Sequence, residues 1–155
     1  MLSELYSDAI LKAAAAIPPV RRLPSPDASA KKVSRVCGSE VEVDLKLDGD
    51  RVADFGMEAR ACALGQASAS ILARNIVGAS AAELLGVARE MRAMLKGGGP
   101  APTGERWRDL GALAPIRDYP PRHASTLLVF EAVAECLAAL GHAEPRSLAG
   151  PSSER

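Results

Sequence analysis

The chain has 155 residues, 19 basic and 19 acidic side chains that balance to a formal net charge of zero, and 3% aromatic residues. A neutral chain has no overall field that attracts nucleic acid or an anionic membrane, and so few rings cannot form a stacking platform for single-stranded nucleic acid. No apolar run is long enough to span a bilayer and the acidic start lacks the basic region of a secretory signal, so we expect a cytoplasmic protein whose partners include neither nucleic acid nor a membrane.

The first expected element is a helix over residues 4–17, in which apolar residues recur with helical spacing. Ser3 is a suitable N-cap, and the Pro18-Pro19 pair ends the helix. Residues 18–30 contain further prolines and show no hydrophobic period, which predicts an irregular connection.

Three antiparallel strands are expected next, the first over residues 32–36. The second alternates between apolar and charged residues over 41–47, and Asp48-Gly49-Asp50 forms a hairpin turn into a third strand over 53–59. This alternation predicts one buried face and one face toward water. The charged residues expected on the wet face are Glu42, Asp44 and Lys46, and the apolar residues expected in the core are Val41, Val43, Leu45, Leu47, Ala53, Phe55, Met57 and Ala59.

The second half of the chain is expected to be helical. A helix over residues 62–77 ends at Gly78, whose lack of a side chain suits the position after a helix. Ser80 and Glu83 have the spacing of a capping box, which predicts the start of a second helix that runs to the glycines at 97–99.

A short helix within 106–113 and a last helix over 125–140 complete the expected elements. We therefore predict an α+β fold in one domain over residues 1–140, in which a three-stranded antiparallel sheet is covered on one face by the N-terminal helix and a C-terminal helical layer. Residues 141–155 are polar and are expected to form a disordered tail.

Three cysteines, Cys37, Cys62 and Cys136, are odd in number and widely spaced, which does not indicate a disulfide framework. Cys37 and Cys62 stand at the ends of expected strands, at joins that can point toward one shared edge of the sheet. Cys62 also opens a helix, where free backbone N–H groups favour a thiolate. By residue type alone, each is better explained as a small buried hydrophobe than as a ligand. Cys136 lies in the middle of the last helix and is interpreted as a packing residue.

The segments around these two cysteines resemble the U-type iron–sulfur cluster scaffold family, the group that comprises IscU, the N-terminal domain of NifU, and SufU. The resemblance is carried by Cys37-Gly38-Ser39 and by the small-residue run at 61–70. The opening segment at 5–10 is similar to the family's first helix, and residues 97–118 are similar to the insertion that marks the SufU branch. The similarity extends over residues 4–140 and implies the SufE/NifU-like fold.

Members of this family use three cysteines and one aspartate to bind zinc or to hold a nascent [2Fe–2S] cluster, whose sulfur comes from a cysteine desulfurase and which passes to apo-proteins. The resemblance places Cys37 and Cys62 at the first two cysteine positions and Ser39 at the aspartate position. The cysteine that should open the last helix is missing from this chain.

Two alignments of that last helix remain open. One puts Ser125 at the third cysteine position, and the other puts Ala124 there, with His123 matching a histidine of the IscU branch. A neutral hydroxyl is a weak metal ligand and cannot accept persulfide sulfur, so Ser39 and Ser125 are weak candidates as ligands. The candidate ligands are therefore Cys37, Cys62 and His123, which leave a fourth position open for zinc or for a labile or dimer-shared cluster.

Three functions follow from this resemblance, none of them enzymatic. The first is a divergent assembly scaffold that transiently binds iron and a [2Fe–2S] cluster and passes it to apo-proteins. The second is a zinc-binding, SufU-like sulfur-transfer partner of a cysteine desulfurase, and the third is a degenerate homologue that binds no metal and acts only through partners. We expect a monomer or a weak dimer.

Overall fold

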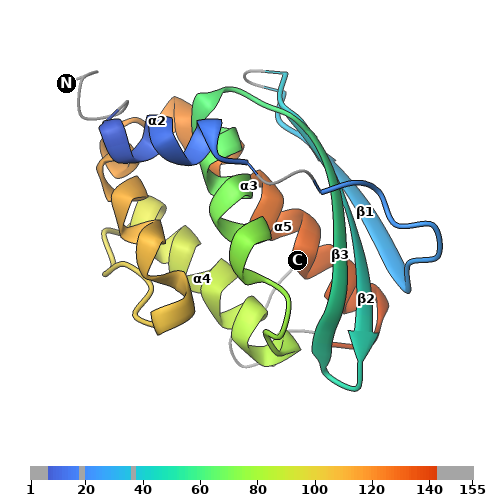
Figure 1. Cartoon of the computed structure of the whole chain (residues 1–155). Coiled ribbons are helices and arrows are strands. Elements are labelled where there is room, and N and C mark those ends of the chain that lie inside the picture. Colours follow the sequence, from blue (N-terminus) through green and yellow to red (C-terminus); the bar gives the residue numbers. More distant parts are fainter. Residues whose placement is uncertain (1–6, 18–19, 36–37, 143–155) are drawn as a thin grey trace.

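The computed structural model describes residues 7–17, 20–35 and 38–142. Its elements are, in chain order, α2 (Asp8–Ala15), β1 (Ala28–Val33), β2 (Glu40–Asp48), β3 (Arg51–Arg60), α3 (Ala63–Asn75), α4 (Ala81–Gly97), the 3₁₀ segments η1 (Glu105–Asp118) and η2 (Pro120–Arg122), and α5 (His123–Ala139). The strands form one antiparallel sheet in the order β1-β2-β3, and the helices lie on one face of it (Figure 1). The predicted α+β architecture is confirmed.

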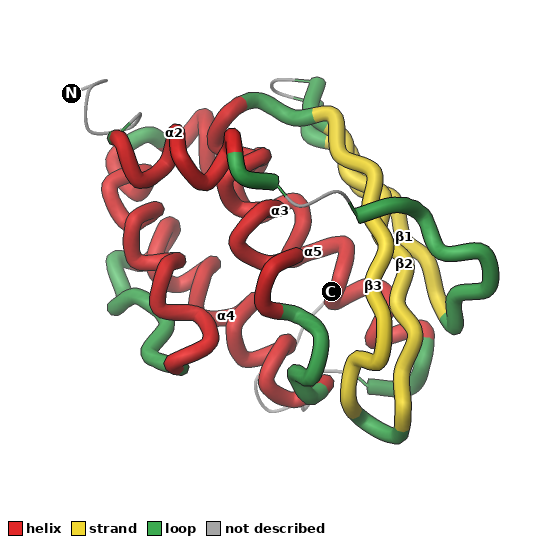
Figure 2. The backbone as a smooth tube through the Cα atoms, viewed as in Figure 1, coloured by secondary structure: helices red, strands yellow, loops and turns green. Residues whose placement is uncertain are grey.

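Helix α5 is the central helix of the fold. It packs on β1 and β2 and also contacts α3 and α4 (Figure 2), while α3 reaches β3 as well. Leu128, Phe130 and Leu137 of α5 are buried in the hydrophobic core. No helix within the described residues is long and apolar enough to cross a membrane.

The first strand lies earlier in the chain than the sequence pattern suggested. It covers Ala28–Val33 instead of 32–36, and it pairs with β2 from Ala28 opposite Leu45 to Val33 opposite Glu40. Its sequence of alanine, serine and lysine has no strong strand periodicity, so pairing with β2 decides its position.

A bulge in the hairpin between β2 and β3 changes which residues face the core. Lys46 lies opposite Asp54 but Leu47 lies opposite Val52, so Ala53 is left over in β3. Val52 is buried and Ala53 is exposed, which corrects the expectation that Ala53 faces the core. A one-residue shift in register moves the side chains of a strand to its opposite face, and in β3 this shift occurs at the bulge, between Val52 and Asp54.

The outer face of the sheet is not uniformly wet, because residues 20–27 cross it. Asp44 was expected to face water, yet it is 0% exposed. Its carboxylate accepts hydrogen bonds from Arg22 Nε at 2.7 Å and Nη2 at 2.9 Å, from the Leu23 N–H at 2.9 Å, and from the Ser29 hydroxyl. Burial by itself raises the pKa of the Asp44 carboxyl, but these hydrogen bonds outweigh it and hold the pKa below its usual value.

Gly56, the residue of β3 opposite Asp44, must be a glycine because the same crossing segment leaves no space for a side chain. A Cβ at this position would lie 2.5 Å from the Arg21 carbonyl oxygen and 2.8 Å from the Leu23 nitrogen. The backbone of the segment therefore packs directly on the backbone of the sheet.

Helix α2 begins after its own cap, Ser7, whose Oγ accepts a hydrogen bond from Ile10 N at 3.4 Å. Residues 1–6, including the expected cap Ser3, lie outside the described residues. Ile10 and Ala13 face the core from this short helix.

The predicted capping box of α4 is half formed. Ser80 Oγ accepts a hydrogen bond from Glu83 N at 3.1 Å, as expected for an N-cap. The Glu83 carboxylate instead accepts from Arg106 Nε at 3.1 Å and from Trp107 Nε1 at 2.8 Å. This pairing ties the start of α4 to η1, whose Trp107 is 1% exposed.

The remaining helices differ from expectation mainly at their ends. Helix α3 ends at Asn75, η1 extends over Glu105–Asp118 in place of a short helix at 106–113, and α5 begins at His123. The tail at 143–155 lies outside the described residues, so the predicted domain limit near 140 stays a prediction.

Candidate functional site

The candidate site lies where β2 begins, β3 ends, and α3 and α5 begin. Glu40 pairs with Arg60 at this edge of the sheet, so Ser39, just before β2, lies across from Cys62, just after β3. Ser125 enters the same place from the first turn of α5.

The side chain of Cys62 is in contact with Ser125. The Cys62 thiol donates to Ser125 Oγ at 3.7 Å, and the Cys62 N–H donates to Ser39 Oγ at 3.4 Å. Both serines are buried, while Cys62 is half-buried. Of the two residues considered for the third cysteine position, Ser125 is the one whose hydroxyl is hydrogen-bonded to the Cys62 thiol.

Small residues on α3 allow this contact. A Cβ on Gly65 would lie 3.3 Å from the Ser125 carbonyl oxygen and 2.8 Å from Ala61 Cβ. One turn further, Ser68 Oγ donates to the Thr126 carbonyl at 2.6 Å. The first turns of α3 and α5 are therefore held at close range.

A shallow hollow of about 420 Å³ opens in front of Cys62, and it is lined by Gly38, Ser39, Arg60, Ala61, Cys62 and Gln66. Gln66 Nε2 donates to the Ala61 carbonyl at 2.9 Å, which shapes one wall. Arg60 is exposed and gives the hollow a positive charge. Arg60 is not among the site residues predicted from the sequence, although its position two residues before Cys62 was the available signal.

His123 is buried at the junction of η1 and α5. Its Nε2 lies 3.0 Å from the Ile116 carbonyl oxygen and 3.1 Å from the Arg117 carbonyl oxygen. Carbonyl oxygens accept hydrogen bonds only, so Nε2 carries the proton and donates it to them. Nδ1 is then the only ring nitrogen of His123 with a lone pair for a metal.

Cys136 lies far from this edge, in the interface between α5 and the sheet. It is 0% exposed and its Sγ is 3.8 Å from the Val43 carbonyl oxygen. Burial, together with the nearby charges of Asp44 and Glu135, raises the pKa of the Cys136 thiol to about 12. The structure agrees with its interpretation as a packing residue.

The donor groups that meet in the described part of the site are the thiol of Cys62 and the hydroxyls of Ser39 and Ser125. Cys37, the first candidate ligand, lies outside the described residues. Among the residues that the structure describes, no group of three or more His, Cys, Asp or Glu side chains is placed to hold a metal ion. A complete ligand set would therefore need Cys37.

Comparison with known proteins places this arrangement in a family. The family profile of the NifU-like N-terminal domain matches residues 11–124. The chain is 27% identical over 101 residues to the iron–sulfur cluster assembly scaffold protein IscU of Thermotoga maritima, a match that covers 65% of this chain and 70% of that protein. It is 25% identical over 101 residues to the protein of the same name from Streptococcus pyogenes, covering 65% and 63% respectively.

Solved structures share the fold. The N-terminal part of a nitrogen-fixing NifU-like protein from Brucella abortus superposes with a TM-score of 0.88 at 46% identity, covering 90% of this chain and 96% of that one. A candidate SUF-system scaffold protein from Fervidobacterium islandicum has the same fold, with a TM-score of 0.79 at 21% identity over 87% and 98% of the two chains. With well over half of its residues matched by the family profile, the chain belongs to the NifU-like N-terminal domain family.

Proposed function

We propose that this protein is an iron–sulfur cluster assembly scaffold that holds its cargo loosely. The observation that carries the proposal is the placement of the Cys62 thiol, at the start of α3 and at the mouth of an open hollow. A thiol in this position can bind iron or sulfur that arrives from solvent or from a partner. The two relatives named IscU are described as assembly scaffolds, which supports this function for the shared fold.

The cargo in this proposal is a transient [2Fe–2S] cluster, bound by the thiolates of Cys62 and Cys37. His123 contributes through Nδ1, because Nε2 donates to two backbone carbonyls. A histidine that ligates a metal through one nitrogen commonly donates its other N–H in this way. Ser39 and Ser125 act as hydrogen-bond partners of Cys62, and neither supplies a thiolate.

Such a ligand set would bind a cluster less firmly than the four-ligand sets typical of stable iron–sulfur proteins. Weak retention suits a carrier that receives sulfur from a cysteine desulfurase and passes the cluster to apo-proteins. The protein is then a carrier and not a catalyst. An alternative function uses the same residues: they would bind zinc, and the protein would act in sulfur transfer as a SufU-like partner.

A second candidate function is supported by the serines. The hydroxyl of Ser125 stands beside Cys62, where a third thiol would complete the site. If two thiols are too few, the protein binds no metal and acts only through partners of the assembly machinery, for example by competing with a complete scaffold.

Anaerobic reconstitution distinguishes these functions. The purified protein is first analysed for zinc and iron per chain, then incubated with ferrous iron, cysteine and a cysteine desulfurase, and its visible absorption is recorded. The scaffold function predicts a [2Fe–2S] spectrum that is lost in Cys62→Ser and in Cys37→Ser. Cys136→Ala, which removes the thiol buried away from the hollow, is the matched control and should retain the spectrum.

Transfer completes the test. An apo-ferredoxin added to the reconstituted protein should gain its cluster faster than from free iron and sulfide. Zinc as purified, lost in Cys62→Ser, would favour the sulfur-transfer role. No metal under either condition, combined with binding to a desulfurase or a complete scaffold, would favour the partner-only function.

A further inference from the structure

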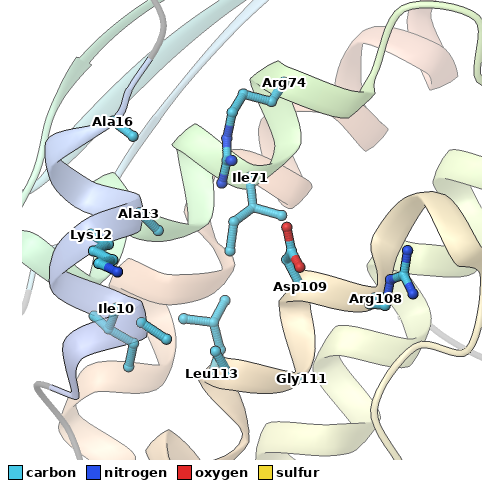
Figure 3. Close-up of a pocket in the computed structure, with 12 residues that line it drawn as sticks. Ile10, Lys12, Ala13, Ala16, Ile71, Arg74, Arg108, Asp109, Gly111 and Leu113 are labelled. Atoms are coloured by element: carbon cyan, nitrogen blue, oxygen red, sulfur yellow. The ribbon is translucent and has the colours of Figure 1, made fainter.

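A second cavity lies away from the cysteine edge, between α2, α3 and η1 (Figure 3). It encloses about 430 Å³, which is within the range of about 300–1,000 Å³ typical of small-molecule sites. Arg74 lines it from the last turn of α3, twelve residues after Cys62, which corresponds to about 18 Å along the helix axis. The cavity is therefore separate from the proposed cluster site.

The cavity exists because small residues face each other across it. Ala9 and Ala13 of α2 and its C-cap Ala16 line one side, and Gly111 and Ala112 of η1 line the other. Protein interiors are normally filled to the density of organic crystals, and larger side chains at these positions would have filled the space.

Its floor is apolar. Ile10, Ile71 and Leu113 line the cavity, and each is at most 2% exposed. Figure 3 shows the three side chains meeting at the base of the cavity, one from each of the three elements. An apolar group of a ligand could lie on this floor and lose contact with water, which favours its binding.

The rim carries an excess of positive charge. Lys12, Arg74 and Arg108 stand around the floor, together with the carboxylate of Asp109 (Figure 3). Within the described residues, none of these three cations forms an ion pair. Arg106, by contrast, pairs with a carboxylate at 3.1 Å elsewhere on the same η1 segment.

We propose that this cavity binds a small organic carboxylate with a compact apolar body, a site independent of the iron–sulfur function. The apolar floor holds the body of the ligand, and the cationic rim holds the carboxylate. Among the described residues that line the cavity, three positive charges and one negative charge leave a net charge of two positives, which selects an anion over a neutral or cationic analogue of the same shape.

Asp109 and the three cations should affect the binding of an anion in opposite directions. The Asp109 carboxylate lies on the rim and repels a bound anion, so its removal should strengthen binding while removal of a cation should weaken it. A cavity that binds ligands only through its apolar floor would show neither effect.

The probe is 3-phenylpropionate, compared with 3-phenylpropanamide and 3-phenylpropylamine, which have the same body with a neutral or a positive head group. Binding to the full chain is followed by chemical-shift changes in two-dimensional ¹H–¹⁵N spectra at low salt. We expect saturable shifts for residues around Ile71 and Leu113, with the carboxylate binding most tightly and the amine most weakly. Added salt should weaken the carboxylate selectively, because exposed charges are screened.

The variants separate charge from shape. Arg74→Gln should weaken 3-phenylpropionate by about threefold, and Asp109→Asn should tighten it by about threefold, as expected for exposed charge pairs. Lys96→Gln, at an exposed position in the last turn of α4, is the matched control and should change nothing. Ala9→Leu at an exposed helical position fills the cavity while preserving helix propensity, and it should abolish binding.

Several results would overturn the proposal. These are the absence of saturable shifts at millimolar probe, equal binding of the carboxylate and the amide, and no tightening in Asp109→Asn. Equal loss in Lys96→Gln and Arg74→Gln would also reject it, since a nonspecific charge effect would then explain the binding.

Discussion

Replacing Ser125 by cysteine is the most direct test of whether the Cys62 edge is a metal site that lacks one ligand. The Cys62 Sγ lies 3.7 Å from Ser125 Oγ, so the new thiol would stand beside the existing one. Two thiolates bound to one zinc ion at about 2.3 Å each can be at most about 4.6 Å apart, and the observed separation meets this limit. Replacing the hydroxyl oxygen by sulfur changes the buried side chain by one atom, so we expect the fold to be retained.

The expected gain follows from the energy of one ligand. A complete structural zinc site contributes about 10–16 kcal/mol through four ligands, so one ligand contributes about 2.5–4 kcal/mol. At about 1.4 kcal/mol for each tenfold change, Ser125→Cys should tighten zinc binding by about two to three orders of magnitude.

The assay is an anaerobic competition for zinc against a chromophoric chelator, with reductant present so that the paired thiols stay reduced. Ala124→Cys is the matched control, because it places the new thiol one residue away, at the other position considered for the third cysteine. The double variant Cys62→Ser with Ser125→Cys should lose the gain. The reasoning is refuted if Ala124→Cys tightens zinc as much as Ser125→Cys does, or if the gain survives without Cys62.

Three further predictions concern the contacts that hold the fold. Asp44→Asn should lower the free energy of unfolding by about 2–3 kcal/mol in urea titrations, since it removes a buried charge that accepts four hydrogen bonds. The control is Glu42→Gln, on the partly exposed side of the same network, which should lower the free energy of unfolding by less than about 1 kcal/mol. The folded-state pKa of Asp44 lies below its unfolded value, so its contribution to stability is complete above about pH 4 and is lost as the pH falls through the lower folded pKa. Wild type and Asp44→Asn should therefore converge in stability in acid. Gly56→Ala should lower the free energy of unfolding by about 1–3 kcal/mol in the same titration, because its Cβ would clash with backbone atoms that cannot rotate out of the way. An unchanged midpoint would contradict the close packing of residues 20–27 on the sheet. Glu83→Ala should lower the free energy of unfolding by about 1–3 kcal/mol, and it should red-shift the fluorescence of Trp107 because its indole N–H then hydrogen-bonds to water. An unchanged spectrum and an unchanged urea midpoint would show that this hydrogen bond contributes little.

Local signals in the sequence predicted the elements that depend on local physics. The cap at Ser80 formed because a hydroxyl next to free N–H groups acts within one helical turn. The strict alternation in β2 predicted the burial of Val41, Val43 and Leu45, because side chains alternate across a strand, whereas Leu47 near its end is only half-buried. The spacing of Cys62 from the preceding strand likewise predicted its place at the start of α3.

Other features of the fold depend on partners distant in the chain. The position of β1 follows from its pairing with β2, and the bulge that exposes Ala53 is a property of the hairpin ladder. Burial of Asp44 depends on a segment about twenty residues earlier, which the alternating pattern of β2 does not reveal.

The candidate site shows the same division. Sequence by itself determined that a thiol stands at the start of a helix, and the family resemblance implied that the third family cysteine is missing and that Ser39 and Ser125 stand at ligand positions. Only the tertiary structure decided that the Cys62 thiol donates a hydrogen bond to Ser125, and that His123 Nε2 donates to the carbonyls at the end of η1. The reason is that α3 and α5 are brought together by close packing at Gly65, a contact between residues about sixty positions apart that no local pattern specifies.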